Sequence, residues 1–190
     1  MSAVRRPAAP RARRFDPGRR DHIVEACLDV IAEHGVAGAS SRRIAAAADV
    51  PLGSVTYHFE SMDALLQAAF ERFATEVSDR FEVRMAAASS LEEARASIVE
   101  MIVGNDDPRE MVLSHELYTL AARVPAFRRL THEWMARSRR GLERHVDPMT
   151  ARMLDALIEG LQIHRALDTN ERDVDEVRVA VERITSGVEV

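Results

Sequence analysis

The sequence predicts an all-α protein, and three observations support this fold class. Hydrophobic residues make up 46% of the 190 residues and charged residues 30%, a mixture typical of a globular protein with a buried core. Apolar residues recur three and four positions apart in most segments, and no segment alternates polar and apolar residues as a strand does. Glycine and proline are few, so little in the chain interrupts helices.

Residues 1–18 are the exception, and we expect them to form a disordered, arginine-rich arm. They combine prolines and arginines with little apolar periodicity. The net charge of −5 hides this basic segment: residues 1–62 carry nine arginines against seven acidic residues, whereas residues 63–190 carry seventeen against twenty-four. A flexible basic arm of this kind commonly binds a polyanion.

Two helices are expected next, of which the second is short. The first covers residues 19–34 and stops at Gly35, because glycine suits the position just after a helix. The second covers residues 41–48, with Ser40 as its N-cap. Their apolar residues recur at helical spacing: Ile23, Ala26, Cys27, Val30 and Ile31 in the first helix, and Ile44, Ala45 and Ala48 in the second.

A tight turn then leads to a third short helix, residues 51–58. Asp49 tolerates the left-handed conformation that such a turn needs, and Pro51 suits the first turn of a helix. Two short helices joined in this way form a helix-turn-helix motif, whose second helix can enter the major groove of DNA. In the third helix, Gly53 would allow the backbone to approach DNA closely.

Six longer helices follow. Ser61 is the expected N-cap of a helix that runs to about residue 87, with Asp63 in its first turn near the positive end of the helix dipole. The remaining helices are expected at residues 90–104, 108–122, 125–146, 149–166 and 172–188. We therefore divide the chain into the arm, a helix-turn-helix DNA-binding domain at 19–62, and a larger helical ligand-binding and dimerisation domain at 63–190.

The last two helices carry apolar ridges, the second of them with heptad-like spacing. A terminal hairpin with two such faces could cap its own core, but pairing with a second copy would make a four-helix interface. The residues expected in a homodimer interface are Leu154, Leu157, Ile158, Leu161, Val174, Val177, Val181 and Ile184.

Residues 19–66 resemble the N-terminal domain of the TetR family of transcriptional regulators. They read RRDHIVEACLDVIAEHGVAGASSRRIAAAADVPLGSVTYHFESMDALL. The shared features are a first helix ending in EHG, a serine that opens the second helix, IA within it, then G-S, an aromatic–His pair, HF and S-x-x-A-L-L. The resemblance implies a ligand-responsive regulator, most often a repressor that binds a palindromic operator as a homodimer and is released by a small molecule.

The resemblance also implies which residues touch double-stranded DNA. Phosphate contacts fall to residues beside the second helix and at the end of the third, and groove contacts to the leading face of the third. The set is Ser40, Arg42, Arg43, Leu52, Gly53, Ser54, Thr56, Tyr57 and His58. This sequence departs from the family pattern at Asp49, Leu52, Thr56 and Met62, and two of these departures remove a common lysine. Our hypothesis is that the arm replaces the missing positive charges.

The family further implies that the fourth to seventh helices enclose a pocket for a small-molecule effector. Large side chains at helical spacing could line it: Met101, Met111, His115, Tyr118, Phe127, Trp134 and Met135, with Arg137 as a partner for an anionic ligand. For each of these residues an ordinary core position is the alternative, since methionine and aromatic side chains mainly fill cores.

Other functions have little support. No apolar run approaches the roughly 20 residues that span a bilayer, and no signal peptide follows the basic N-terminus, so we expect a cytoplasmic protein without membrane contact. No cofactor, metal site or enzyme activity is expected, because neither His115-Glu116 nor His132-Glu133 continues to HExxH, and phosphate loops and nucleophile elbows are lacking. Two alternatives stay open: a nonspecific nucleic-acid-binding protein, and a helical dimeric interaction module that does not bind DNA.

Overall fold

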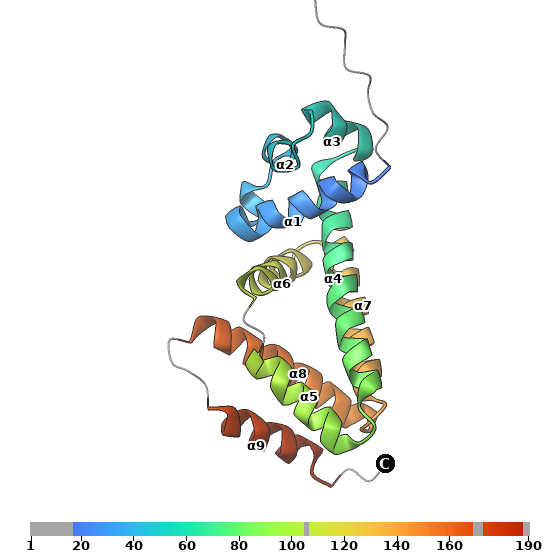
Figure 1. Cartoon of the computed structure of the whole chain (residues 1–190), viewed down its shortest axis with the longest axis vertical. Coiled ribbons are helices and arrows are strands. Elements are labelled where there is room, and N and C mark those ends of the chain that lie inside the picture. The colour runs from blue at the N-terminus through green and yellow to red at the C-terminus, as the bar shows by residue number, and fades with distance from the viewer. Residues whose placement is uncertain (1–16, 105–106, 169–172, 188–190) are drawn as a thin grey trace, which may run out of the picture.

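The computed structural model describes residues 17–104, 107–168 and 173–187, and these residues form nine α-helices (Figure 1). Within these ranges there is no strand, so the predicted all-α fold class is confirmed. The arm predicted at residues 1–18 lies outside the described residues except for its last two.

Helices α1 (Arg19–Gly38), α2 (Ser41–Ala47) and α3 (Leu52–His58) form a small head at one end of the molecule (Figure 1). The predicted N-cap of α2 is confirmed, because the Ser40 side chain accepts a hydrogen bond from the Arg43 backbone N–H at 3.3 Å. The turn between α2 and α3 is confirmed too, since Asp49 has a φ of 48°. Together α2 and α3 form the expected helix-turn-helix.

Gly35 interrupts α1 where the sequence predicts its end. Its φ of 67° and ψ of 170° are non-helical, and the chain then makes one further turn to Gly38. Side chains other than glycine rarely adopt this backbone region. A Cβ atom at this position would also lie 2.7 Å from Oε1 of Glu116 on α6.

We expect Gly35→Ala to lower the free energy of unfolding by about 1–3 kcal/mol, because the alanine must either strain the backbone or displace the Glu116 side chain. The matched control is Gly53→Ala: a Cβ there meets no atom within 4 Å, so stability should stay within about 1 kcal/mol of the wild type. Chemical denaturation followed by circular dichroism measures both. Equal losses in the two variants would contradict this account of Gly35.

The rest of the molecule is built around a long helix, α4 (Met62–Ala87), which runs from the head to the opposite end beside α7 (Pro125–Leu142) (Figure 1). Ser61 caps α4 as predicted, accepting from the Ala64 N–H at 3.1 Å. The four remaining helices are α5 (Leu91–Gly104), α6 (Pro108–Ala121), α8 (Pro148–Leu167) and α9 (Val174–Thr185).

Several predicted helix ends differ from the observed ones, by at most four residues (146 against Leu142). Helix α7 ends at Leu142 rather than residue 146, because Asp147 already caps α8 by accepting from the backbone N–H groups of Met149 and Thr150. Pro51 is the N-cap of α3 rather than its first residue. Helix α9 ends at Thr185, not residue 188.

Two hydrophobic cores hold the helices together. The first unites the head with α4, α6 and α7, and its fully buried members include Ile23, Ile44, Leu65, Phe70 and Leu117. Cys27 also lies there, and burial raises the pKa of its thiol to about 12, which keeps it unreactive. Because residues of both predicted domains share this core, the head is packed directly onto the C-terminal part.

The second core joins α4, α5, α8 and α9 with the end of α7, and it takes up most of the side chains predicted for the dimer interface. Four predicted interface residues are buried inside this chain: Leu154, Ile158, Val177 and Val181. Leu157, Leu161 and Ile184 are partly buried against the same core, and only Val174 has substantial exposure, at 41%. The apolar seam of α9 thus packs mainly on its own chain, since α5 covers it.

Candidate functional site

Helix α3 presents polar side chains outward and is anchored by its apolar ones. Val55 and Phe59 are buried in the first core, and Val50 packs against it. On the opposite side Leu52 is 42% exposed and Tyr57 84% exposed. A large aromatic side chain this exposed gains no packing energy within the chain, so Tyr57 is free to contact a partner.

The backbone of α3 is open to close approach around Gly53, where even an added methyl group would meet no atom within 4 Å. Thr56 is exposed, and its hydroxyl donates to the Gly53 carbonyl at 3.3 Å. Ser54 and His58 are half-buried, and the His58 ring meets the Tyr57 ring edge-on, with centroids 5.1 Å apart. Hydroxyl and phenol groups at these positions suit contacts to base edges and phosphates.

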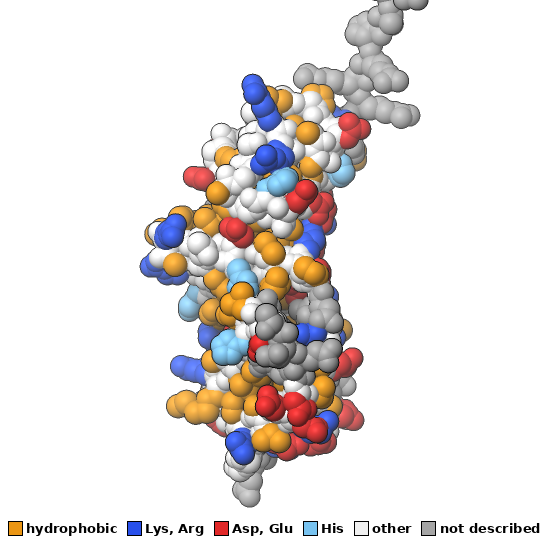
Figure 2. Space-filling model, turned by 90° about the vertical axis from the view of Figure 1, so that its left-hand side faces the viewer, with side chains coloured by type: hydrophobic (Ala, Val, Ile, Leu, Met, Phe, Trp, Pro, Cys, Tyr) orange, Lys and Arg blue, Asp and Glu red, His pale blue; other side chains and the backbone are white. Residues whose placement is uncertain are grey.

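Helix α2 adds basic side chains to the same end of the molecule. Arg42 is exposed, whereas the guanidinium of Arg43 donates to the Gly38 carbonyl. Ser40 is exposed and serves as the N-cap described above. On the face shown in Figure 2, basic and acidic side chains both stand at the head, and acidic side chains gather at the opposite end, formed by α5, α8 and α9. The exposed guanidinium of Arg42 is therefore a local positive charge on α2 that suits a phosphate, not part of a wholly basic head.

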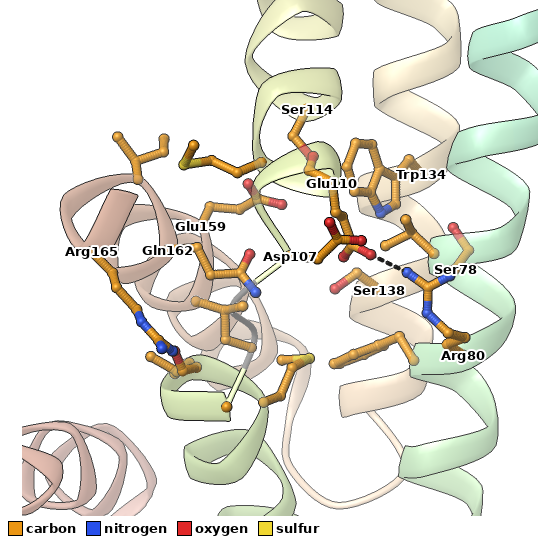
Figure 3. A pocket seen from close by; sticks show the side chains of 18 of the residues that line it. Ser78, Arg80, Asp107, Glu110, Ser114, Trp134, Ser138, Glu159, Gln162 and Arg165 are labelled. Atoms are coloured by element: carbon orange, nitrogen blue, oxygen red, sulfur yellow. Dashed lines mark hydrogen bonds and ion pairs between the residues drawn. The ribbon is translucent and has the colours of Figure 1, made fainter. Parts of the chain in front are cut away.

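A cavity of about 450 Å³ lies between α4, α5, α6, α7 and α8 (Figure 3). This volume falls within the range of about 300–1,000 Å³ that holds small ligands in proteins. Five of the eight predicted ligand-binding residues line it: Met101, Met111, His115, Tyr118 and Trp134. The sequence also supplies lining residues that were not predicted, among them Ser78, Arg80, Glu159, Gln162 and Arg165.

The other three predicted residues do not line this cavity. Phe127 is buried in the first core, where its ring meets Phe70 edge-on. Arg137 is bound to α4: it donates to Glu82 at 2.8 Å and to Asp79 at 2.6 Å, and these carboxylates raise its pKa. Met135 is half-buried elsewhere on α7. The spacing of apolar residues in the sequence could not show which face of α7 lines the cavity.

Three side chains form a connected group in the cavity wall. Tyr118 stacks on Trp134, with ring centroids 5.8 Å apart and planes at 14°. The Tyr118 hydroxyl donates to Oε2 of Glu159 at 2.6 Å, and burial raises the pKa of the Glu159 carboxyl. The sequence offered one signal for Glu159, which is an acidic residue placed among the apolar ridge residues of α8.

Helix α6 connects the cavity with the head. One face carries Met111 and Tyr118 into the cavity, while Leu117 on another face is fully buried in the core shared with α1. Arg109 at its start donates to Glu25 of α1 at 2.6 Å and to Asp29 at 3.1 Å. A ligand that moves α6 therefore also moves groups bonded to the head.

The fold and these surfaces define a helix-turn-helix protein with an exposed second helix and a ligand-sized cavity in its helical C-terminal part. Among the residues that the structure describes, no group of three or more metal-ligating side chains gathers, and no helix is long and apolar enough to cross a membrane.

Comparison with known proteins gives the family. The model for bacterial regulatory proteins of the tetR family matches residues 23–69, and the model for the tetracyclin repressor-like C-terminal domain matches residues 86–187. The chain therefore belongs to the TetR family of transcriptional regulators, as the resemblance implied. One curated relative is the HTH-type transcriptional regulator BetI 1 of Chromohalobacter salexigens, 30% identical over 86% of this chain and 87% of BetI 1.

Solved structures show the same architecture. SCO7518 of Streptomyces coelicolor A3(2) is 50% identical, with a TM-score of 0.83 over 90% of this chain and 99% of that one. The multidrug binding protein EbrR, in complex with imidazole, is 34% identical, with a TM-score of 0.72 over 92% of this chain and 97% of that one. EbrR has also been solved with ethidium, proflavin and malachite green.

Proposed function

We propose that this TetR-family regulator is a homodimeric repressor that binds a palindromic operator and is released when a small molecule fills the cavity. The observation that carries the proposal is the direct connection through α6 between the cavity wall and the core of the head. EbrR, which binds several small molecules, supports a ligand-binding role for the corresponding region here. We expect the protein to act in the cytoplasm, with the DNA that it binds.

The proposed mechanism is a shift between two arrangements of the head. A ligand need only bind the non-DNA-binding arrangement more tightly, and couplings of this kind are typically about 1–3 kcal/mol. Here α6 would carry the shift, because Arg109 and Leu117 attach it to α1 while Met111 and Tyr118 face the ligand.

The proposed dimer contact is an exposed apolar stripe on α8. Met149 is 64% exposed and Met153 50%, and Ala156 and Gly160 continue the same face at helical spacing. Small residues beside the methionines would allow two copies of α8 to approach closely. Two recognition helices in such a dimer read half-sites one helical turn, or a multiple of it, apart.

We propose that the nine residues predicted to contact DNA do so, and that they have two different roles. Leu52, Gly53, Ser54 and Thr56 would face the groove. The remaining members would hold phosphates: Ser40, Arg42, Arg43, Tyr57 and His58. Leu52, exposed and apolar, suits the methyl group of a thymine.

Tyr57→Ala is expected to weaken binding to every DNA sequence without loss of stability, because the side chain is 84% exposed. Ser54→Ala and Thr56→Ala should instead change the order of preference among half-site variants by about 1–3 kcal/mol per base pair. Fluorescence anisotropy with a panel of labelled duplexes measures both effects. If all three variants lose affinity uniformly, the groove assignments are wrong. Tyr57→Phe serves as control for the hydroxyl alone.

A further inference from the structure

The charged side chains that line the cavity differ in whether neighbouring groups compensate their charge. Three arginines reach its wall, and each is engaged by acceptors of this chain: Arg80 pairs with Glu110, and Arg84 lies 3.6 Å from Glu100. Arg165 donates to the backbone carbonyls at the end of α5, at 2.8 Å for Ile102. An anionic ligand would have to compete with these carboxylates and carbonyls for every guanidinium.

Among the residues that the structure describes, no basic side chain pairs with Glu159. Its side chain extends from α8 toward α6 at the wall of the cavity (Figure 3). Its carboxylate accepts a hydrogen bond from the neutral Tyr118 hydroxyl. The nearby carboxylate of Asp155 has the same sign of charge and disfavours ionisation of Glu159. Asp155 is itself 3.4 Å from Arg139. A carboxylate can accept about four hydrogen bonds, so one phenol leaves most of its capacity unused.

The cavity wall beside Glu159 is aromatic. Tyr118, which holds Glu159, stacks on Trp134, and Phe73 meets the Trp134 ring edge-on with centroids 5.8 Å apart. The faces of such rings attract cations, and Trp is the strongest partner among them. The cavity also holds the buried hydroxyl of Ser78, whose oxygen has no hydrogen-bond partner among the described residues.

From this arrangement we propose that the cavity binds a flat organic cation, with its charge at Glu159 and its ring system against Tyr118 and Trp134. The inference rests on the proposed function, since it names the chemical class of the effector. A bound cation would stabilise the ionised form of Glu159, which burial and Asp155 both disfavour. A neutral ligand would leave the carboxylate as it is, and an anion would be repelled by it.

The test is a fluorescence titration of the full-length protein, without DNA, at about pH 7.5. The probe is proflavin, a planar cation at this pH, and the comparison is acridine, the corresponding uncharged ring system. We expect proflavin to bind at least about tenfold more tightly than acridine, and Glu159→Gln to weaken proflavin at least about tenfold while changing acridine less than about threefold. The thermal midpoint of Glu159→Gln should stay the same or rise, because burial disfavours the carboxylate that it replaces.

Glu100→Gln is the matched control, because Glu100 also lines the cavity but is largely exposed and paired with Arg84. It should change proflavin affinity less than about threefold. Equal binding of proflavin and acridine, or unchanged proflavin binding by Glu159→Gln, would overturn the inference. If proflavin fails to bind while the protein selects one operator, only the inference falls; if Glu159-dependent binding is found without any operator, only the repressor proposal falls.

Discussion

Phe70→Ala is expected to lower the free energy of unfolding by about 3–5 kcal/mol, the largest stability effect that we predict. The Phe70 side chain is fully buried on α4, and its ring meets Phe127 of α7 edge-on at 5.8 Å. It belongs to the core that also contains α1, α2, α3 and α6. Removing the ring leaves a cavity where the head is joined to the C-terminal part.

Urea denaturation at a fixed protein concentration measures this loss. Val83→Ala is the control, because Val83 is on the same helix but 71% exposed, and surface changes usually stay within about 0.5 kcal/mol. A loss below about 1 kcal/mol for Phe70→Ala would mean that the head and the C-terminal part do not depend on this shared core.

Met153→Glu should have the largest effect on DNA binding that we predict outside the head. If the exposed stripe of α8 is the dimer contact, the variant buries a charge without a partner, and dimerisation should weaken by at least ~30-fold, or ~2 kcal/mol. Loss of the dimer separates the two recognition helices, so affinity for a two-half-site duplex should fall toward that for a single half-site. The stability of the monomer should be little changed, because Met153 is 50% exposed.

Sedimentation velocity and binding to one- and two-half-site duplexes test this expectation together. Val83→Glu introduces the same charge on an exposed site of α4 and should leave the dimer intact. A Met153→Glu protein that remains dimeric would contradict the proposed interface and direct attention to the exposed valines of α9, Val174 and Val179.

Local features of this fold could be predicted from the sequence because interactions between residues close in the sequence determine them. Ser40 and Ser61 cap helices where a hydroxyl precedes an apolar period, and Asp49 adopts the left-handed turn. Gly35 breaks α1 because glycine accepts a backbone conformation that other residues rarely adopt. The aromatic side chain of Tyr57 on α3 is exposed as a recognition helix requires.

Long-range partners could not be predicted in the same way. The seam of α9 has the spacing of a dimer contact, but Val177 and Val181 are covered by α5 of the same chain. Arg137 was expected to meet an anionic ligand, yet it is bound by Glu82, which lies 55 positions earlier. Periodicity identifies which face of a helix is apolar, but it does not say which neighbour covers that face.

We propose above all that this protein binds one specific DNA sequence as a dimer. The most direct measurement is selection of genomic fragments of the source organism by purified full-length protein at about physiological salt, with sequencing of the retained DNA and Tyr57→Ala as background. We expect enrichment of a single inverted repeat that Tyr57→Ala does not retain. Retention without a shared motif would contradict it in favour of nonspecific nucleic-acid binding, and no retention at all would favour a helical interaction module.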